Sequence, residues 1–280
     1  MFAWVTASVR SGAAVAAVGA QKAATASVAI PIVSLLVLAP TTRTGRLLLL
    51  GALGLATATG GRATGQDADK KCTVVALDPG HDSRANPETE PIGPGSKTRK
   101  IKDGGGTRGV ATGTPEHVLT LQVAKRLRGA LERRGYCVVM TRDRATGTSM
   151  GNVARARIAN RAGAALFVRI HADGSTDRSR HGSATLYPAP HKGWTDDILP
   201  ESRTAARLVQ AELVARLGSR DLGTIQRGDL TGFNWADVPA VLVELGFMTN
   251  PAEDRRLGKA KYQKRAALGM ARGIERFASP

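Results

Sequence analysis

The sequence predicts one α/β domain with a mostly parallel central sheet of about six strands and helices on both faces. Short apolar runs rich in Val, Leu and Ile alternate along the chain with longer segments in which apolar residues recur every three or four positions. This alternation is typical of parallel sheets, because a crossover between parallel strands needs a connection long enough to hold a helix. No internal repeat is visible and nothing after residue 113 resembles a linker, so we expect one folded domain over residues 71–280.

Residues 1–70 have a different composition, rich in Ala, Gly, Thr and Leu with almost no acidic residues. The apolar block 47–58 follows Arg43 and Arg46 and ends in small residues, which is the pattern of a secretory signal. A second block, 23–39, is barely long enough to span a bilayer. We therefore assign residues 1–70 to an export signal or membrane-proximal segment plus a linker. The protein is expected to be extracellular or in the cell wall or periplasmic space, with an N-terminal membrane anchor as the alternative.

The formal net charge of +17 points to an anionic partner. The basic residues are scattered rather than clustered, so a simply solvated basic surface is the alternative explanation. Aromatic residues make up only 4% of the chain, and no zinc finger or RNA-binding motif is present. The composition therefore argues against nucleic acid as a partner and suits an acidic polymer of the cell envelope, whose binding would weaken with salt.

The predicted domain begins with a strand at 73–77, an apolar run rich in Val. Residues 82–113 are rich in Gly, Pro and charge and are expected to form a surface loop. Thr114 and Pro115 then suit the N-cap and the first position of a helix. Apolar side chains recur at four-residue spacing after them, so this helix is expected to end shortly before Gly135.

The same patterning predicts the remaining elements. Four further apolar runs are the expected strands, at 137–141, 165–170, 183–187 and 239–244. Segments with helical periodicity lie between or after them, at 152–162, 203–217 and 262–277. Because ligands of such sheets gather at the carboxyl ends of the strands, the residues that end these runs are the first candidates for function.

Only two cysteines occur, and each lies at the start of an apolar run: Cys72 before 73–77 and Cys137 in 137–141. If these two strands are parallel neighbours, the cysteines lie side by side. In an exported protein we therefore predict a disulfide between Cys72 and Cys137, with two buried free thiols as the alternative. Neither cysteine is expected to act as a nucleophile, because the titratable residues end the strands that the cysteines begin.

Three apolar runs end in residues that can bind a metal or move a proton: His81, His171 and Glu244. An ionised carboxylate is expensive to bury, so Glu244 indicates a metal ion or a proton transfer. Catalytic zinc takes three protein ligands and keeps a fourth position open for water. Glu116, in the first turn of the helix after the loop, is the best candidate for the third ligand, and His117 beside it is the competitor.

Six motifs follow one another along the predicted domain. They are Leu77-Asp78-Pro79-Gly80-His81; Glu116 at the head of its helix; Gly135 to Arg142 with its terminal Thr-Arg; Arg155 to Asn160; Ile170-His171-Ala172-Asp173; and Pro239 to Asn250. In this order they resemble the zinc-dependent N-acetylmuramoyl-L-alanine amidases of bacterial cell walls, and they cover nearly all of residues 72–277. The resemblance implies a catalytic domain with a six-stranded α/β fold.

The resemblance makes His81, Glu116 and His171 ligands of a Zn²⁺ ion and Glu244 the catalytic carboxylate. Zinc would activate water and polarise the scissile carbonyl, and Glu244 would carry the proton of the water to the leaving amine. The bond cut is then the amide between N-acetylmuramic acid and the L-alanine of the stem peptide. The implied partner is peptidoglycan or released muropeptides, and we expect a monomer.

Four further residues are candidates for contact with substrate. Arg169 and Asp173 stand where the family more often has serine and asparagine. Arg169 is expected to face the site, where it would favour the hydroxide form of the bound water or meet a carboxylate of the stem peptide. The alternative is that it only pairs with a nearby acid. Phe233 and Trp235 precede the last strand and are expected to line the substrate groove, with loop packing as the alternative. The loop 82–113 has too many helix breakers for a long blocking helix, so we predict constitutive activity.

Two other functions fit parts of the sequence. A non-catalytic wall-binding or regulatory protein could retain this fold, but the complete set of His81, Glu116, His171 and Glu244 argues against it. A zinc peptidase that cuts within the stem peptide needs the same water and carboxylate, so the motifs separate it poorly from an amidase.

Overall fold

The computed structural model describes residues 72–147 and 149–279, so the predicted export segment, residues 1–70, lies outside the described residues. The strands are β1 (Val74–Pro79), β2 (Asn86–Pro91), β3 (Arg99–Asp103), β4 (Cys137–Met140), β5 (Leu166–Asp173), β6 (Ser183–Pro188), β7 (Asp221–Arg227) and β8 (Ala240–Phe247). The helices are α1 (Glu116–Glu132), α2 (Asn152–Arg161), α3 (Leu199–Leu217), α4 (Thr231–Asn234), α5 (Pro251–Leu257) and α6 (Ala260–Phe277).

Six strands form one sheet in the order β4-β1-β5-β8-β6-β7. Every neighbouring pair is parallel except β8 and β6. The antiparallel β2–β3 hairpin forms a separate small sheet. The predicted α/β fold with a mostly parallel six-stranded sheet is therefore confirmed.

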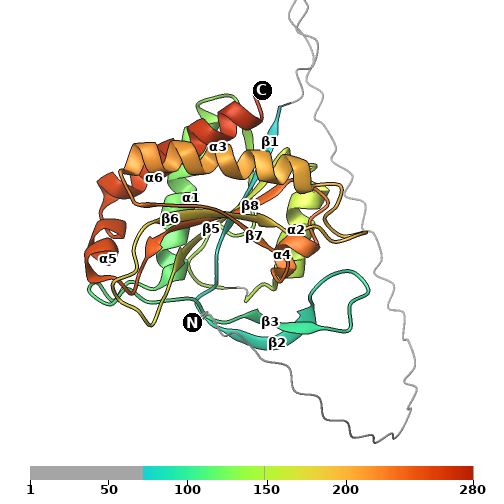
Figure 1. Ribbon diagram of the computed structural model, residues 1–280, viewed down its shortest axis with the longest axis horizontal. Helices are drawn as coiled ribbons and strands as arrows, with labels where there is room; N and C mark the ends of the chain where they lie inside the picture. Colours follow the sequence, from blue (N-terminus) through green and yellow to red (C-terminus); the bar gives the residue numbers. More distant parts are fainter. Residues whose placement is uncertain (1–71, 148, 280) are drawn as a thin grey trace, which may run out of the picture. The chain divides into compact units, whose positions relative to one another are not determined.

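Helices cover both faces of the sheet (Figure 1). Helices α1, α3 and α6 pack on one face, over alternate strand residues such as Leu77, Val168 and Val243. The short α2 and α4 cover the other face, over Phe167 and its neighbours. Burial on both faces explains why the central strands are unbroken apolar runs in the sequence. Within the described ranges, no helix is long and apolar enough to cross a bilayer.

The segment 82–113, expected to be a surface loop, contains the β2–β3 hairpin. Both strands are largely exposed and pair only with each other, so they lack the apolar run that marks the central strands. Strand β7 and the short helices α4 and α5 were also not predicted. β7 is an edge strand that is mostly half-buried and contains Gly223, a combination that weakens the pattern of a strand.

The register of β1 and β4 brings the two cysteines together. Val74 pairs with Cys137, and the Cα atoms of Cys72 and Cys137 lie 5.7 Å apart across a disulfide. The predicted bond is confirmed, and no other cysteine is present in the sequence. Disulfides persist in oxidising compartments, so this bond supports the predicted export.

Candidate metal centre

Three of the predicted residues meet at the carboxyl ends of the central strands. His81 follows β1, and His171 of β5 is paired with Glu244 of β8 across the parallel strands. Because side chains alternate along a strand, His171, Glu244 and Arg169 share the sheet face that α2 and α4 cover. This edge of the sheet is where folds of this kind bind their ligands.

The backbone after β1 directs His81 into this edge. His81 has a left-handed φ of 58°, which is uncommon for a residue with a side chain. Gly80 packs directly against the ring of His171, because a Cβ at residue 80 would lie 2.3 Å from the nearest ring atom. The buried guanidinium of Arg142 donates to the Gly80 carbonyl at 2.9 Å and holds the turn. Arg142, at the end of the motif Gly135 to Arg142, thus supports the turn that carries His81.

Glu116 enters the centre from the start of α1. The helix begins one residue later than predicted, with Pro115 in the N-cap position. Glu116 Oε2 accepts a hydrogen bond from the Thr107 amide at 2.8 Å, and Oε1 accepts one from the Ala172 amide at 3.2 Å. These bonds fix the carboxylate between the histidines, whereas His117, the competing third ligand, lies outside the cluster.

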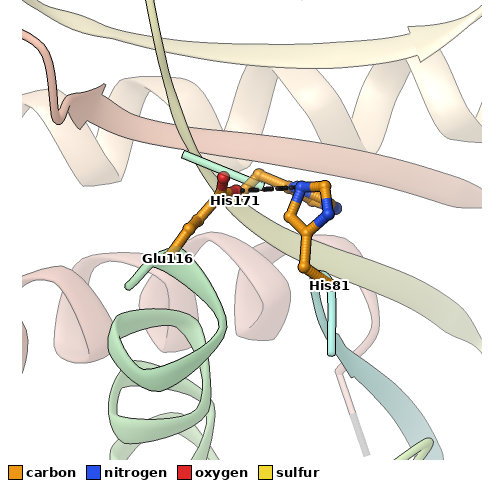
Figure 2. A group of neighbouring side chains, drawn as sticks. All are labelled: His81, Glu116 and His171. Carbon is orange, nitrogen blue, oxygen red and sulfur yellow. Dashed lines mark hydrogen bonds and ion pairs between the residues drawn. The ribbon is translucent and has the colours of Figure 1, made fainter. Parts of the chain in front are cut away.

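His81, Glu116 and His171 point toward one another from three different parts of the chain (Figure 2). One possible ligand atom from each lies within 4.8 Å of the others. Glu116 Oε1 is 3.1 Å from His171 Nδ1 and 3.4 Å from His81 Nε2. His171 Nε2 is buried and has no hydrogen-bond partner in the described part of the chain. The three residues thus offer two imidazoles and one carboxylate, which fit the donor set of a catalytic zinc ion.

Asp103, at the end of β3, holds His81 in place. Its Oδ1 lies 2.6 Å from His81 Nδ1, and its two oxygens accept hydrogen bonds from the amides of Asp82 and Gly105 at 2.9 Å each. A carboxylate behind a metal-binding histidine sets the orientation and the tautomer of the ring. With Nδ1 donating to Asp103, Nε2 is left to face Glu116. Asp103 was not among the predicted site residues, because no local signal in the sequence distinguishes it from the other charged residues of the segment 82–113.

Burial and neighbouring charges shift the pKa values of the three residues in different directions. Burial alone would lower the pKa of His81, but the carboxylates of Glu116 and Asp103 raise it above its usual value. Burial lowers the pKa of His171 despite its contact with Glu116. Burial alone would raise the pKa of Glu116, yet the two histidines lower it to about 2. The carboxylates of Glu116 and Asp103 thus stabilise a positive charge beside His81, as a cation site requires.

Glu244 lies beside this group without belonging to it. Its Oε2 is buried and has no hydrogen-bond partner in the described ranges. Burial, together with the carboxylates of Asp173 and Glu116, raises the pKa of Glu244 well above its usual value. Burial also raises the pKa of Asp173, although its Oδ1 accepts a hydrogen bond from the Gly174 amide at 2.7 Å. A carboxyl group with a raised pKa beside a cation site is suited to take up and release a proton.

Behind the centre, Asp78 of β1 is fully buried between two arginines. Its carboxylate accepts hydrogen bonds from Arg155 at 2.7 Å, Arg169 at 2.8 Å and Thr141 at 2.6 Å. Burial alone would raise the pKa of Asp78, but Arg155 and Arg169 hold it far below its usual value. Arg155 also donates to the His81 carbonyl at 3.2 Å. Arg169 is therefore paired with a buried acid, which is the alternative predicted for it.

The two aromatic candidates lie away from the metal-binding residues. Phe233 of α4 is fully buried in the core against the sheet, so it has no surface for a substrate and is a packing residue. Trp235 is half-buried, and its Nε1 donates to the Pro91 carbonyl at 2.9 Å. It lines a separate groove beside the β2–β3 hairpin. Packing, which was the alternative to substrate contact for both residues, is therefore the role of Phe233.

His81, His171 and Glu244 line a cleft of about 400 Å³. Its apolar lining includes Ala184, Leu186, Leu222, Ile225 and Leu242. Lys100 of β3 lies at its edge, with Nζ 3.2 Å from Asp229 Oδ2, and Arg227 Nε lies 2.7 Å from Oδ1 of the same carboxylate. These ion pairs tie the hairpin to the connection between β7 and α4. The cleft therefore combines an apolar surface with the titratable residues His81, His171 and Glu244.

A family model described as N-acetylmuramoyl-L-alanine amidase (Amidase_3) matches residues 75–276. The N-acetylmuramoyl-L-alanine amidase Rv3717 of Mycobacterium tuberculosis is 32% identical over 222 residues, which cover 73% of this chain and 86% of that protein. The N-acetylmuramoyl-L-alanine amidase AmiC of Neisseria meningitidis is 27% identical over 251 residues, which cover 76% of this chain. The chain spans 54% of the length of that second relative.

Solved structures of similar proteins have the same fold. The chain is similar to the crystal structure of the N-acetylmuramyl-L-alanine amidase Ami1 of Mycobacterium smegmatis, with a TM-score of 0.67 and 29% identity over 73% of this chain and 96% of that one. It is also similar to an N-acetylmuramoyl-L-alanine amidase of Clostridium difficile 630, with a TM-score of 0.59 and 26% identity over 74% of this chain and 96% of that one.

Proposed function

The chain belongs to the Amidase_3 family of N-acetylmuramoyl-L-alanine amidases, and we propose that it cuts the amide bond between N-acetylmuramic acid and the L-alanine of the stem peptide in the cleft beside Glu244. This activity places its action in the cell envelope, on peptidoglycan. One observation carries the proposal: His81, Glu116 and His171 converge from three parts of the chain next to Glu244, whose Oε2 has no hydrogen-bond partner among the described residues.

We propose Zn²⁺ as the ion and His81, Glu116 and His171 as its ligands. Two features support a cation there: Nε2 of His171 has no hydrogen-bond partner among the residues that the structure describes, and two carboxylates lie beside His81. When bound, zinc would polarise the scissile carbonyl and lower the pKa of water, so that the water loses a proton more readily and becomes a better nucleophile.

Glu244 supplies the proton transfers of the proposed reaction. Its carboxylate takes the proton of the attacking water and then delivers it to the leaving amine. Burial and the neighbouring acids raise the pKa of Glu244, so its carboxylate is a stronger base toward water than that of an exposed glutamate. We propose that Asp173, half-buried and lining the same cleft, contacts the substrate, while Arg169 positions the site through Asp78.

Asp103 gives a prediction on metal binding that is independent of turnover. An Asp103→Asn variant of the full chain is expected to bind Zn²⁺ about 10–100-fold more weakly than the wild type, because the His81 ring loses the carboxylate that orients it. Competition with a chromophoric chelator measures this affinity. The control is Glu88→Gln on the same hairpin, an exposed residue whose carboxylate pairs with Lys102 at 2.7 Å. Wild-type zinc affinity in Asp103→Asn would contradict the assigned role.

We also propose how the protein reaches its substrate. Residues 1–70 direct export, as their composition indicates, and the disulfide between Cys72 and Cys137 suits the oxidising compartment that follows. The net charge of +17 attracts the chain to anionic wall polymers, and the protein acts as a monomer.

A further inference from the structure

A second hollow lies beside the metal cleft, between the β2–β3 hairpin and α2. It has a volume of about 720 Å³. Four basic residues line it, Arg99 and Lys102 from β3 and Arg157 and Arg161 from α2, together with the aromatic ring of Trp235. We call this hollow the α2 groove. None of the metal-binding residues lines it.

The two arginines of α2 carry charge that is available to a ligand. Arg157 and Arg161 are one helical turn apart and both exposed. In the described ranges neither forms an ion pair with an acidic side chain, and the Arg157 guanidinium instead lies 5.4 Å from the centre of the Trp235 ring. A guanidinium over an aromatic ring makes a cation–π contact and keeps N–H donors at its edge, where they can meet an anion.

The acidic residues of the α2 groove are already engaged. Glu90 is buried and accepts hydrogen bonds from the amides of Asn152 and Val153, at 2.7 and 3.1 Å. Glu88, on the same hairpin, pairs with Lys102. These acids therefore do not neutralise the arginines of α2, and the α2 groove presents net positive charge.

The α2 groove and the metal cleft adjoin each other at the start of α2. Lys102 lines both of them. Asn152 faces the cleft, while its neighbours Gly151 and Val153 line the α2 groove. A long polymer can therefore occupy both hollows at once, whereas a single stem peptide bound at the metal-binding residues fills only the cleft.

We propose that the α2 groove binds a neighbouring segment of the peptidoglycan polymer while the stem peptide to be cut lies in the metal cleft. This inference rests on the proposed function, because peptidoglycan is the substrate of an amidase and its stem peptides carry free carboxylates. The carboxylates pair with Arg157 and Arg161, and a sugar ring packs on Trp235. The preferred substrate is then the polymeric wall rather than released muropeptides.

Two pairs of charge reversals on the full chain test this proposal. Arg157→Glu with Arg161→Glu alters the α2 groove. Arg203→Glu with Arg207→Glu on α3 makes the same change in net charge at exposed residues with the same spacing. Co-sedimentation with peptidoglycan stripped of phosphodiester polymers measures binding, and hydrolysis is followed on this polymer and on soluble muropeptides.

The groove variant is expected to bind the polymer at least about tenfold more weakly, a change of about 1.4 kcal/mol, and to lose polymer hydrolysis relative to muropeptide hydrolysis. The α3 pair is expected to bind like the wild type. Equal losses in both pairs would show an effect of net charge alone and overturn the proposal, as would no loss in the groove variant. Arg157→Gln with Arg161→Gln repeats the test without placing acids in the last turn of α2.

The co-sedimentation measurement tests this proposal separately from the proposed function. Sedimentation with the polymer needs no turnover, so it decides the role of the α2 groove even if no bond is cut. Absence of product from both polymer and muropeptides in the wild type would contradict the amidase activity. Loss of polymer binding in the groove variant, with muropeptides still cut, supports both.

Discussion

A Glu244→Gln variant is expected to lose hydrolysis of muropeptides by about 10²–10⁴-fold while it binds zinc like the wild type. The amide keeps the size of the side chain but cannot accept a proton from water. Glu244 lies beside the metal-binding group and not in it, and its Oε2 has no protein partner in the described residues, so the change removes no contact that holds the fold. Turnover of purified muropeptides and zinc content are measured on the same protein.

The matched control for this variant is Glu201→Gln, an exposed glutamate in the first turn of α3. It removes one carboxylate from the surface and is expected to leave both turnover and zinc content unchanged. Retained turnover in Glu244→Gln would remove Glu244 from the reaction. Loss of zinc together with turnover would instead make Glu244 part of the metal site.

An Asp78→Ala variant is expected to lower the free energy of unfolding by about 3–5 kcal/mol. Asp78 is the main counter-charge of two buried guanidiniums, those of Arg155 and Arg169. Its removal leaves Arg169 without an ion pair to an acid among the described residues, and leaves Arg155 with Asp82 at 3.6 Å. Because Arg155 also donates to the His81 carbonyl, zinc binding is expected to weaken as well. Urea denaturation of the full chain, followed by fluorescence, measures the loss.

The control for Asp78 is Glu275→Gln on the surface of α6, where Glu275 pairs with Arg272 at 2.7 Å. An exposed ion pair of this kind contributes at most about 1 kcal/mol. A loss of stability in Asp78→Ala no larger than in Glu275→Gln would show that the buried network does not anchor the loop that carries His81.

The central strands and the reactive residues at their ends could be predicted from the sequence for a physical reason. A parallel sheet buried on both faces needs unbroken apolar runs, so a His or Glu at the end of such a run stands out. His81, His171 and Glu244 all lie at that edge of the sheet. Glu116 was separable from His117 only through the family resemblance, because both lie in the same helical turn.

The hairpin and the residues that support the site could not be predicted in the same way. Strands β2 and β3 are rich in charge and proline, and tertiary contacts such as Glu90 with the first turn of α2 hold them. Asp103 is recognisable only through its contact with His81. Phe233 lies shortly before β8 in the sequence, where a residue that lines the substrate groove was expected. In the structure, α4 directs its side chain into the core.

The bond that is cut and the need for zinc are both tested by mass spectrometry of the first product that the full chain forms from a purified muropeptide, with zinc and after chelation. We expect that an intact stem peptide, beginning with its L-alanine, is released from the lactyl group of N-acetylmuramic acid only when zinc is present. Fragments cut within the stem peptide would contradict it and identify a peptidase. No product from a chain that holds zinc would also contradict it and would favour the wall-binding protein.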